Sequence, residues 1–301
     1  MTRGGFAAYA ALCATVLFWG LSFTATKLAL AHLAPLAVIF LRFALAFVLL
    51  APVAGRAALR LPASAHAKVL GISILFPGCY FAFETFALRL TTATNASLID
   101  AAIPMTVLGL SAVVTGTRPP LRSVLGVAAS LIGVAMLVGL GGGPVNAGDA
   151  MMLGSVASAS VYMVAASRFS GVTPLELTTL QMFWGAVFFL PFFAADMPDL
   201  AAVPASGLAA VACLGLFATV GAFLAYNYAL SKVPAATASM FINAVPVVAV
   251  FGANLALGET VTAAQVAGGT LILASVYATA AAGRKEDTVS EGESLELGEE
   301  T

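Results

Sequence analysis

Long apolar stretches alternate with short polar breaks along almost the whole chain. Each stretch has roughly the 20 residues that a helix needs to cross a bilayer, and each is rich in alanine and leucine. Strands of a membrane barrel are about 10 residues long and alternate in polarity, so the pattern predicts helices. Charged residues or clusters of proline and glycine separate ten such spans, near residues 6–31, 35–54, 68–89, 95–115, 122–140, 148–168, 174–195, 207–231, 236–257 and 262–282.

The composition places these helices in a membrane. Hydrophobic residues make up 61% of the 301 residues and charged residues 9%, and the mean hydropathy is +1.02. A soluble globular chain carries about 25% charged residues. This chain therefore has too little polar surface to face water, and we expect an all-α membrane protein in a lipid bilayer. Its 13 basic and 14 acidic residues nearly balance, so no basic patch predicts nucleic-acid binding.

Lysine and arginine indicate the orientation, because cytoplasmic loops carry an excess of both. With a cytoplasmic N-terminus, only Lys27, Arg42 and Arg89 fall toward the outer side. The inner side then receives Arg3, Arg56, Arg60, Lys68, Arg118, Arg122, Arg168, Lys232, Arg284 and Lys285. We therefore expect a multi-pass protein of the bacterial plasma (inner) membrane with both termini in the cytoplasm. Residues 284–301 are acidic and poor in apolar residues, which predicts a disordered cytoplasmic tail.

One apolar phrase occurs twice. Residues 93–104 read ATNASLIDAAIP and residues 235–246 read AATASMFINAVP. The same spacing relates Ala87-Leu88 to Ala229-Leu230, Gly116 to Gly258, and Gly126 to Gly268. We therefore divide the chain into two five-helix repeats, residues 6–140 and 148–282. Because five is odd, the second repeat enters the membrane from the opposite side, which predicts inverted repeats around a central cavity.

Inverted repeats are a common plan of secondary transporters, in which one site at the membrane midplane opens alternately to each side. The duplication therefore favours transport. The alternative is a gene duplication that serves only packing or folding.

Four segments spread over both repeats carry a family pattern: Trp19-Gly20, the PLAVIFLRF run at 35–43, the repeated A-x-x-A-S…P phrase, and LGETVTAAQVAGG at 257–269. Together they resemble the EamA-type branch of the drug/metabolite transporter superfamily. One departure is that Gly258-Glu259 appears in the first repeat as Gly116-Thr117, which weakens any role that requires both glutamates. The resemblance implies a ten-helix exporter of small metabolites, similar to aromatic amino acid exporters. It also implies that the first four helices of each half surround a cavity, with the fifth and tenth outside it.

Four charged residues fall toward the outer ends of spans one to four. Charge inside a membrane is expensive, roughly 2.5–3.5 kcal/mol for Lys, Arg or Asp at the centre of a helix. The four residues are Lys27, Arg42, Glu84 and Asp100. We expect the two bases to pair with the two acids. This charge cluster has two interpretations: a site for the ammonium and carboxylate of an amino acid, or an ion-paired belt that closes an outer gate. Either carboxyl could also carry a coupling proton.

Polar and aromatic residues at helical spacing complete the candidate substrate site. Trp19, Ser22 and Thr26 share one face of span one. The other candidates, besides Glu84 and Asp100, are Tyr80, Ser97, Tyr162, Trp184, Tyr226, Asn227, Ser239 and Asn243. Single serines are also common at helix contacts, and single tyrosines or tryptophans at membrane interfaces.

Two prolines predict helix hinges. Pro104 and Pro246 fall near the middles of spans four and nine. A proline inside a helix frees the carbonyl four residues earlier and bends the helix.

Sequence motifs of other functional classes do not occur. There is no HExxH or aspartate-rich metal motif and no G-x-x-x-x-G-K-[ST] phosphate loop, so we expect no enzyme, no metal, no cofactor and no ATP hydrolysis. The predicted function is a secondary transporter that exports amino acids, aromatic or broadly neutral, by alternating access. The alternatives are an exporter of another small metabolite or lipophilic cation, or a non-transporting membrane sensor.

Glycines in spans five and ten predict close helix packing. Gly126, Gly133, Gly268 and Gly269 could bring these spans together between subunits. The expected assembly is a monomer or a weak homodimer through spans five and ten.

Overall fold

The computed structural model describes residues 3–116, 121–138, 146–166, 172–230, 242, 244–275 and 277–278. These residues form helices and connecting turns and include no strand, which confirms the all-helical prediction. Six of the ten predicted spans are helical segments long and apolar enough to cross a membrane, some of them built from more than one element: Ala7–Leu30, Pro35–Ala58, Ala63–Leu90, Ala93–Thr115, Leu175–Ala195 and Ala205–Tyr226. Shorter apolar helices occur at Val124–Gly133, Val245–Leu257 and Ala263–Ser275.

The two halves of the chain share several elements that follow one another in the same order. The first half contains α1 (Arg3–Leu30), α2 (Pro35–Leu50), η1 (Ala51–Gly55), α3 (Arg56–Leu59), α4 (Ala63–Ser73), η2 (Ile74–Cys79), α5 (Tyr80–Leu90), α6 (Ala93–Asp100), α7 (Ile103–Thr115) and α8 (Leu121–Val138). The second contains α9 (Ala147–Ala166), α10 (Pro174–Ala195), α11 (Ala205–Cys213), η3 (Leu214–Gly221), α12 (Ala222–Leu230), α14 (Val245–Leu257) and the helix Ala263–Ser275. The η elements are short π-helices, and η2 and η3 interrupt the corresponding spans of the two halves.

Local sequence explains several helix ends. The Thr92 hydroxyl accepts the Asn95 backbone N–H at 2.9 Å and caps the start of α6. Thr173 and Glu176 form a capping box at the start of α10. The helices α7 and α14 end at Gly116 and Gly258, both with φ of 67°. Glycine fits these two positions because it lacks the Cβ that disfavours the left-handed conformation.

The two predicted hinge prolines lie at helix starts. The helix α6 ends at Asp100, two turn residues follow, and Pro104 is the second residue of α7. Pro246 is likewise the second residue of α14. Proline has no N–H to donate, so the first helical turn is where it costs least. Span four is therefore divided into two helices at this point, instead of being one helix bent by an internal proline.

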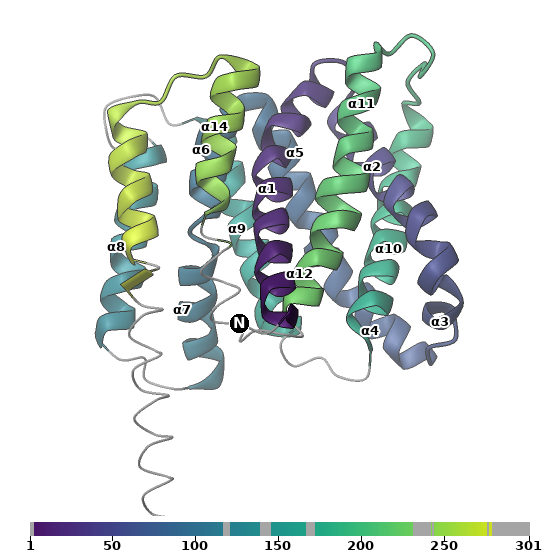
Figure 1. Ribbon diagram of the computed structural model, residues 1–301, viewed down its shortest axis with the longest axis horizontal. Helices are drawn as coiled ribbons and strands as arrows, with labels where there is room; N and C mark the ends of the chain where they lie inside the picture. Colours follow the sequence, from purple (N-terminus) through teal and green to yellow (C-terminus); the bar gives the residue numbers. More distant parts are fainter. Residues whose placement is uncertain are drawn as a thin grey trace, which may run out of the picture.

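The helix α1 lies in the middle of the molecule, where it packs against α14, α12 and α11 (Figure 1). The helix α2 packs mainly against α10, and α5 mainly against α9. Each of these pairs joins one helix of the first half to one of the second. The core between the two halves is therefore shared, and a site there draws on both.

Spans five and ten lie against each other at one edge of the chain (Figure 1). A Cβ built on Gly133 of α8 would lie 2.7 Å from both the Gly268 carbonyl oxygen and Ile272 Cγ1. A Cβ on Gly269 would lie 2.7 Å from Leu98 Cδ2. These glycines thus permit close packing within one chain, while the homodimer through spans five and ten stays a prediction.

Candidate functional site

Four of the predicted polar residues meet between α2, α5 and α6. Arg42, Tyr80 and Glu84 are buried, with 4%, 7% and 3% of their surface exposed. The Tyr80 hydroxyl donates to Asp100 Oδ2 at 2.9 Å, and Arg42 and Glu84 interact electrostatically. Within the described structure, Glu84 Oε2 and Asp100 Oδ1 are buried without a hydrogen-bond partner. We call these four residues the polar cluster.

Arg42 connects the polar cluster to the second half of the chain. Its Nε donates to Thr219 Oγ1 in η3 at 2.7 Å. Its guanidinium carbon lies 4.3 Å from the centroid of the Phe81 ring, a cation–π distance. The guanidinium is therefore held by a hydroxyl and an aromatic face as well as by the Glu84 charge.

Aromatic rings from both halves lie beside the polar cluster. Phe76 of η2 stacks on Tyr162 of α9, with ring centroids 5.0 Å apart, and its centroid is 6.0 Å from that of Phe223 in α12. Trp19 of α1 continues the series, 5.5 Å from Phe223 and 5.3 Å from Tyr226. Three predicted residues, Trp19, Tyr162 and Tyr226, are thus brought into one aromatic group.

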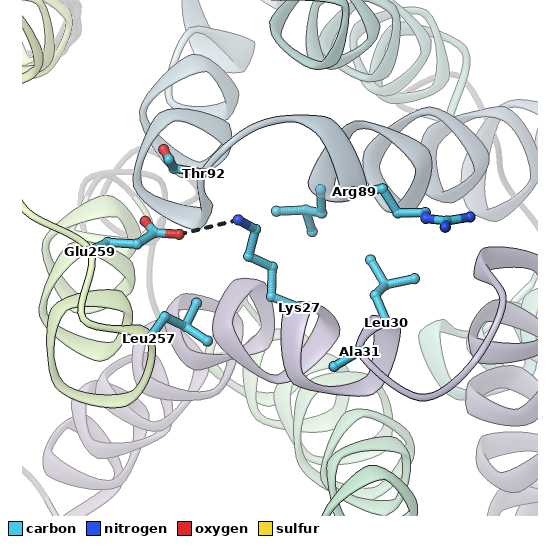
Figure 2. A pocket seen from close by; sticks show the side chains of 8 residues that line it. Lys27, Leu30, Ala31, Arg89, Thr92, Leu257 and Glu259 are labelled. Atoms are coloured by element: carbon cyan, nitrogen blue, oxygen red, sulfur yellow. Dashed lines mark hydrogen bonds and ion pairs between the residues drawn. The ribbon is translucent and has the colours of Figure 1, made fainter.

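A pocket of about 440 Å³ opens where α1 and α14 end (Figure 2). Lys27 points across it toward Glu259, and its Nζ lies 3.4 Å from Glu259 Oε1. Arg89 extends away from this ion pair (Figure 2). The predicted pairing of Lys27 with Glu84 or Asp100 is therefore wrong. Lys27 lies at the last turn of α1, next to the loop after α14, and its partner comes from the second half. The pocket is lined by Lys27, Leu30, Ala31, Leu88, Arg89, Thr92, Leu257 and Glu259.

Glu259 also holds the N-terminal end of α6. Its Oε1 accepts the Ala93 N–H at 2.9 Å and its Oε2 the Thr94 N–H at 3.0 Å. These are the first backbone donors of α6, which have no partner inside the helix. Burial raises the pKa of the Glu259 carboxyl, but hydrogen bonds from Thr94 and Ala93 and the charge of Lys27 outweigh burial and lower that pKa. The carboxylate is therefore charged at neutral pH.

The remaining predicted residues lie elsewhere or bond locally. Ser22 donates to the Trp19 carbonyl and Ser97 to the Thr94 carbonyl, each within its own helix. Thr26 is buried. Trp184 packs in a separate apolar cluster with Ala58, Val69 and Leu180. The side chain of Asn227 and the whole of Ser239 and Asn243 lie outside the described residues.

Sequence reasoning missed Gln181. Its Nε2 donates to the Phe76 carbonyl oxygen at 3.0 Å and to the Tyr162 hydroxyl at 3.1 Å. A signal was present, because Gln181 is the eighth residue of α10 as Arg42 is the eighth residue of α2, and both helices begin with proline. Comparing the two repeats position by position would have found this residue.

The chemistry that these groups offer is recognition of charge and of apolar surface. The guanidinium suits a carboxylate, the carboxyl groups suit an ammonium, and the aromatic faces suit either a cation or an apolar side chain. Within the described residues, no group of three or more His, Cys, Asp or Glu side chains is placed to hold a metal ion.

Comparisons with known proteins agree with these features. The EamA-like transporter family matches residues 6–139 and 146–281. The chain is 30% identical over 268 residues to an "Uncharacterized transporter" of Archaeoglobus fulgidus, covering 88% of this chain and 96% of that one. It is 27% identical to a "Probable terminal-alkyne amino-acid exporter" of Streptantibioticus cattleyicolor, covering 88% and 91% of the two chains. A solved crystal structure shares the fold, with a TM-score of 0.66 at 20% identity over 91% of this chain and 96% of that one.

Proposed function

We propose, from the premise that this chain belongs to the EamA-like transporter family, that it exports amino acids across the plasma membrane by alternating access. Family membership makes the chain a membrane transporter, and the names of its relatives point to transport and not to catalysis. One relative is named for an amino-acid cargo. That name supports amino acids as the substrate class.

The observation that carries this proposal is a pair of buried, unbonded carboxyl oxygens in the polar cluster, which also contains the Arg42 guanidinium. Glu84 Oε2 and Asp100 Oδ1 accept no hydrogen bond within the described structure. Buried acceptors are normally satisfied, and a substrate ammonium would bring three donors. Arg42 supplies the opposite charge for a substrate carboxylate. A zwitterion can therefore satisfy both signs of the polar cluster at once.

The aromatic group suits the rest of such a substrate. Phe76 of η2 lies against Tyr80 of the polar cluster and stacks on Tyr162. Trp19 joins the same aromatic group through Phe223. Apolar or aromatic side chains pack favourably on such rings. Aromatic and broadly neutral amino acids are therefore the substrates that we favour.

The architecture that goes with this function is ten spans in two inverted repeats, residues 6–140 and 148–282, around a central cavity. The elements that recur in the same order in both halves, such as η2 and η3 or α7 and α14, support it. The end of α1 and the start of α3, which carries Arg56, lie at opposite faces (Figure 1). This arrangement fits a cytoplasmic N-terminus, because basic residues concentrate on the cytoplasmic side.

A second candidate substrate class is the lipophilic cation. The polar cluster contains two carboxyl groups but one guanidinium, and it adjoins several aromatic rings. An organic cation without a carboxylate would suit a cluster in which carboxyl groups outnumber guanidinium groups. The same assay separates the two classes.

The test is counterflow in proteoliposomes preloaded with single amino acids, nucleotide sugars or organic cations. Exchange limited to amino acids supports the proposal, and exchange limited to organic cations supports the second candidate. Glu84→Gln and Asp100→Asn should each reduce the exchange rate at least tenfold, because each removes a charge from the polar cluster. Asp196→Asn, at the exposed end of α10, is the matched control. A panel without any exchange, in protein that is folded, would overturn the proposal.

A further inference from the structure

The two π-helices η2 and η3 interrupt equivalent spans, and each leaves backbone carbonyl groups outside the regular helical pattern. In the hydrocarbon core such groups must be satisfied by other parts of the protein. In η2 the donors come from α9 and α10: Ser158 Oγ bonds the Leu75 carbonyl at 3.0 Å, and Gln181 Nε2 bonds the Phe76 carbonyl at 3.0 Å. Both helices belong to the second half of the chain.

The same arrangement holds η3, with the halves exchanged. Trp19 Nε1 of α1 bonds the Ala218 carbonyl at 3.2 Å. Arg42 of α2 bonds the Thr219 hydroxyl, which itself donates to the Leu214 carbonyl at 2.8 Å. Here both donor helices belong to the first half. Each half therefore holds the interrupted helix of the other.

The donors occupy equivalent positions in the two repeats. Arg42 and Gln181 are each the eighth residue of a helix that begins with proline. Trp19 and Ser158 precede those opening prolines, Pro35 and Pro174, by the same number of residues. The chemistry differs, however, because Gln181 reaches a carbonyl directly and Arg42 acts through a hydroxyl. The pair is related by the repeat but is not identical.

We propose that Arg42–Thr219 and Gln181–Phe76 are opposed positioning contacts that set the balance between the outward-facing and inward-facing states. This inference rests on the proposed function. In an inverted-repeat transporter the two states exchange the shapes of the two halves. A hydrogen bond that is stronger in one of these two shapes therefore favours one state when its donor lies in the first half. The equivalent bond with its donor in the second half favours the opposite state.

We expect that breaking the two contacts shifts the balance between the two states in opposite directions. Thr219→Val removes the hydroxyl that Arg42 bonds, and Gln181→Leu removes the amide that bonds Phe76, each with little change in volume. If both contacts served only stability, both variants would loosen the same core in the same way. Because they oppose each other, one variant shifts the protein outward and the other inward, and the double variant returns toward the wild type.

The measurement is labelling of Leu30→Cys, which lines the outer pocket, by a membrane-impermeant maleimide in intact cells. The background is the full chain with Cys13, Cys79 and Cys213 changed to alanine. We expect the labelling rate to change at least threefold in opposite directions in Thr219→Val and Gln181→Leu.

The matched control is Thr179→Val, which removes a buried hydroxyl bonded within α10. Thr219→Ser keeps the hydroxyl that Arg42 bonds, so it should be labelled at the wild-type rate.

A second pair of variants tests the same inference if Thr219→Val or Gln181→Leu fails to fold. Trp19→Phe should shift labelling in the direction of Thr219→Val, and Ser158→Ala in the direction of Gln181→Leu. Shifts of the same sign in both halves, or no shift in any variant, would overturn the inference. Counterflow by the wild type is measured in parallel. If the wild type exchanges no substrate, the proposed function fails; if it exchanges substrate and the signs agree, only the present inference fails.

Discussion

At the scale of single residues, the charge of the Glu259 carboxylate should stabilise the fold, and changing the pH separates this contribution from that of side-chain packing. Burial raises its pKa, but the N–H groups of Thr94 and Ala93 and the charge of Lys27 lower it below the ordinary value of 4.5. A carboxyl of this kind contributes stability above its ordinary pKa and loses it as the pH falls through the folded-state pKa. Glu259→Gln should therefore lower the free energy of unfolding by about 1 kcal/mol at neutral pH, and by much less in acid.

Thermal unfolding of the detergent-solubilised chain checks this expectation. Wild type and Glu259→Gln are compared at neutral pH and at an acidic pH low enough to protonate the Glu259 carboxyl in the folded protein. Asp196→Asn serves as the control, since Asp196 is an exposed carboxyl at the end of α10. An equal difference between wild type and variant at both pH values would show that the charge of Glu259 is not the source of its effect.

The sequence identified the charged residues within the spans more reliably than their partners. Arg42, Glu84 and Asp100 do lie in one cluster. Charged residues inside a membrane are costly and therefore stand out in the sequence, and consecutive spans are usually neighbours in space. Lys27 pairs with Glu259 because α1 packs on α14, a contact between distant segments that no local pattern encodes. Gln181 was missed because one amide in an apolar span is an ordinary observation until the repeats are compared.

At the scale of secondary-structure elements, the helices α7 and α14 end in the same way, each at a glycine in the left-handed conformation. Gly116 and Gly258 have φ of 67°, and a Cβ at either position would meet nothing within 4 Å. An alanine there would therefore cost about 1 kcal/mol from backbone strain alone. Gly71 is the matched control, because it too has open space but lies inside α4, where alanine should stabilise the helix by about 0.5–1 kcal/mol.

Equilibrium unfolding of Gly116→Ala, Gly258→Ala and Gly71→Ala in mixed micelles measures these differences. The first two should lower the free energy of unfolding by similar amounts and the third should raise it. If Gly71→Ala destabilised the protein as much as the other two, the left-handed conformation would not explain the effect.

Helix type and approximate position could be predicted from hydrophobicity, but helix interruptions could not. The six long spans lie close to their predicted ranges because about 20 apolar residues have few alternatives in a bilayer. The π-helices η2 and η3 instead depend on which side chains of the other half are available to bond their carbonyl groups. Those contacts are set by tertiary packing, which a single helix pattern does not contain.

At the scale of the whole molecule, the close contact of α8 with the helix Ala263–Ser275 joins the ends of the two halves. Gly133→Val should destabilise the protein by about 1–3 kcal/mol, because the added atoms overlap the Gly268 carbonyl and Ile272. Gly109→Ala is the control, since its Cβ would make ordinary contact with Val127 at 3.9 Å. Thermal unfolding measures stability, and light scattering of the same samples reports oligomeric state. Wild-type stability of Gly133→Val would contradict this packing.

The hydrogen bonds from Ser158 and Gln181 to η2 also bear on how the chain is made. The first half leaves the ribosome first, before the synthesis of Gln181, whose amide bonds the Phe76 carbonyl. An unsatisfied backbone carbonyl costs several kcal/mol in lipid. The newly inserted first half is therefore incomplete until span seven arrives, and a chain truncated before it should be degraded by quality-control proteases. Supplied as a separate polypeptide, the second half should rescue it, each half acting as a folding partner of the other.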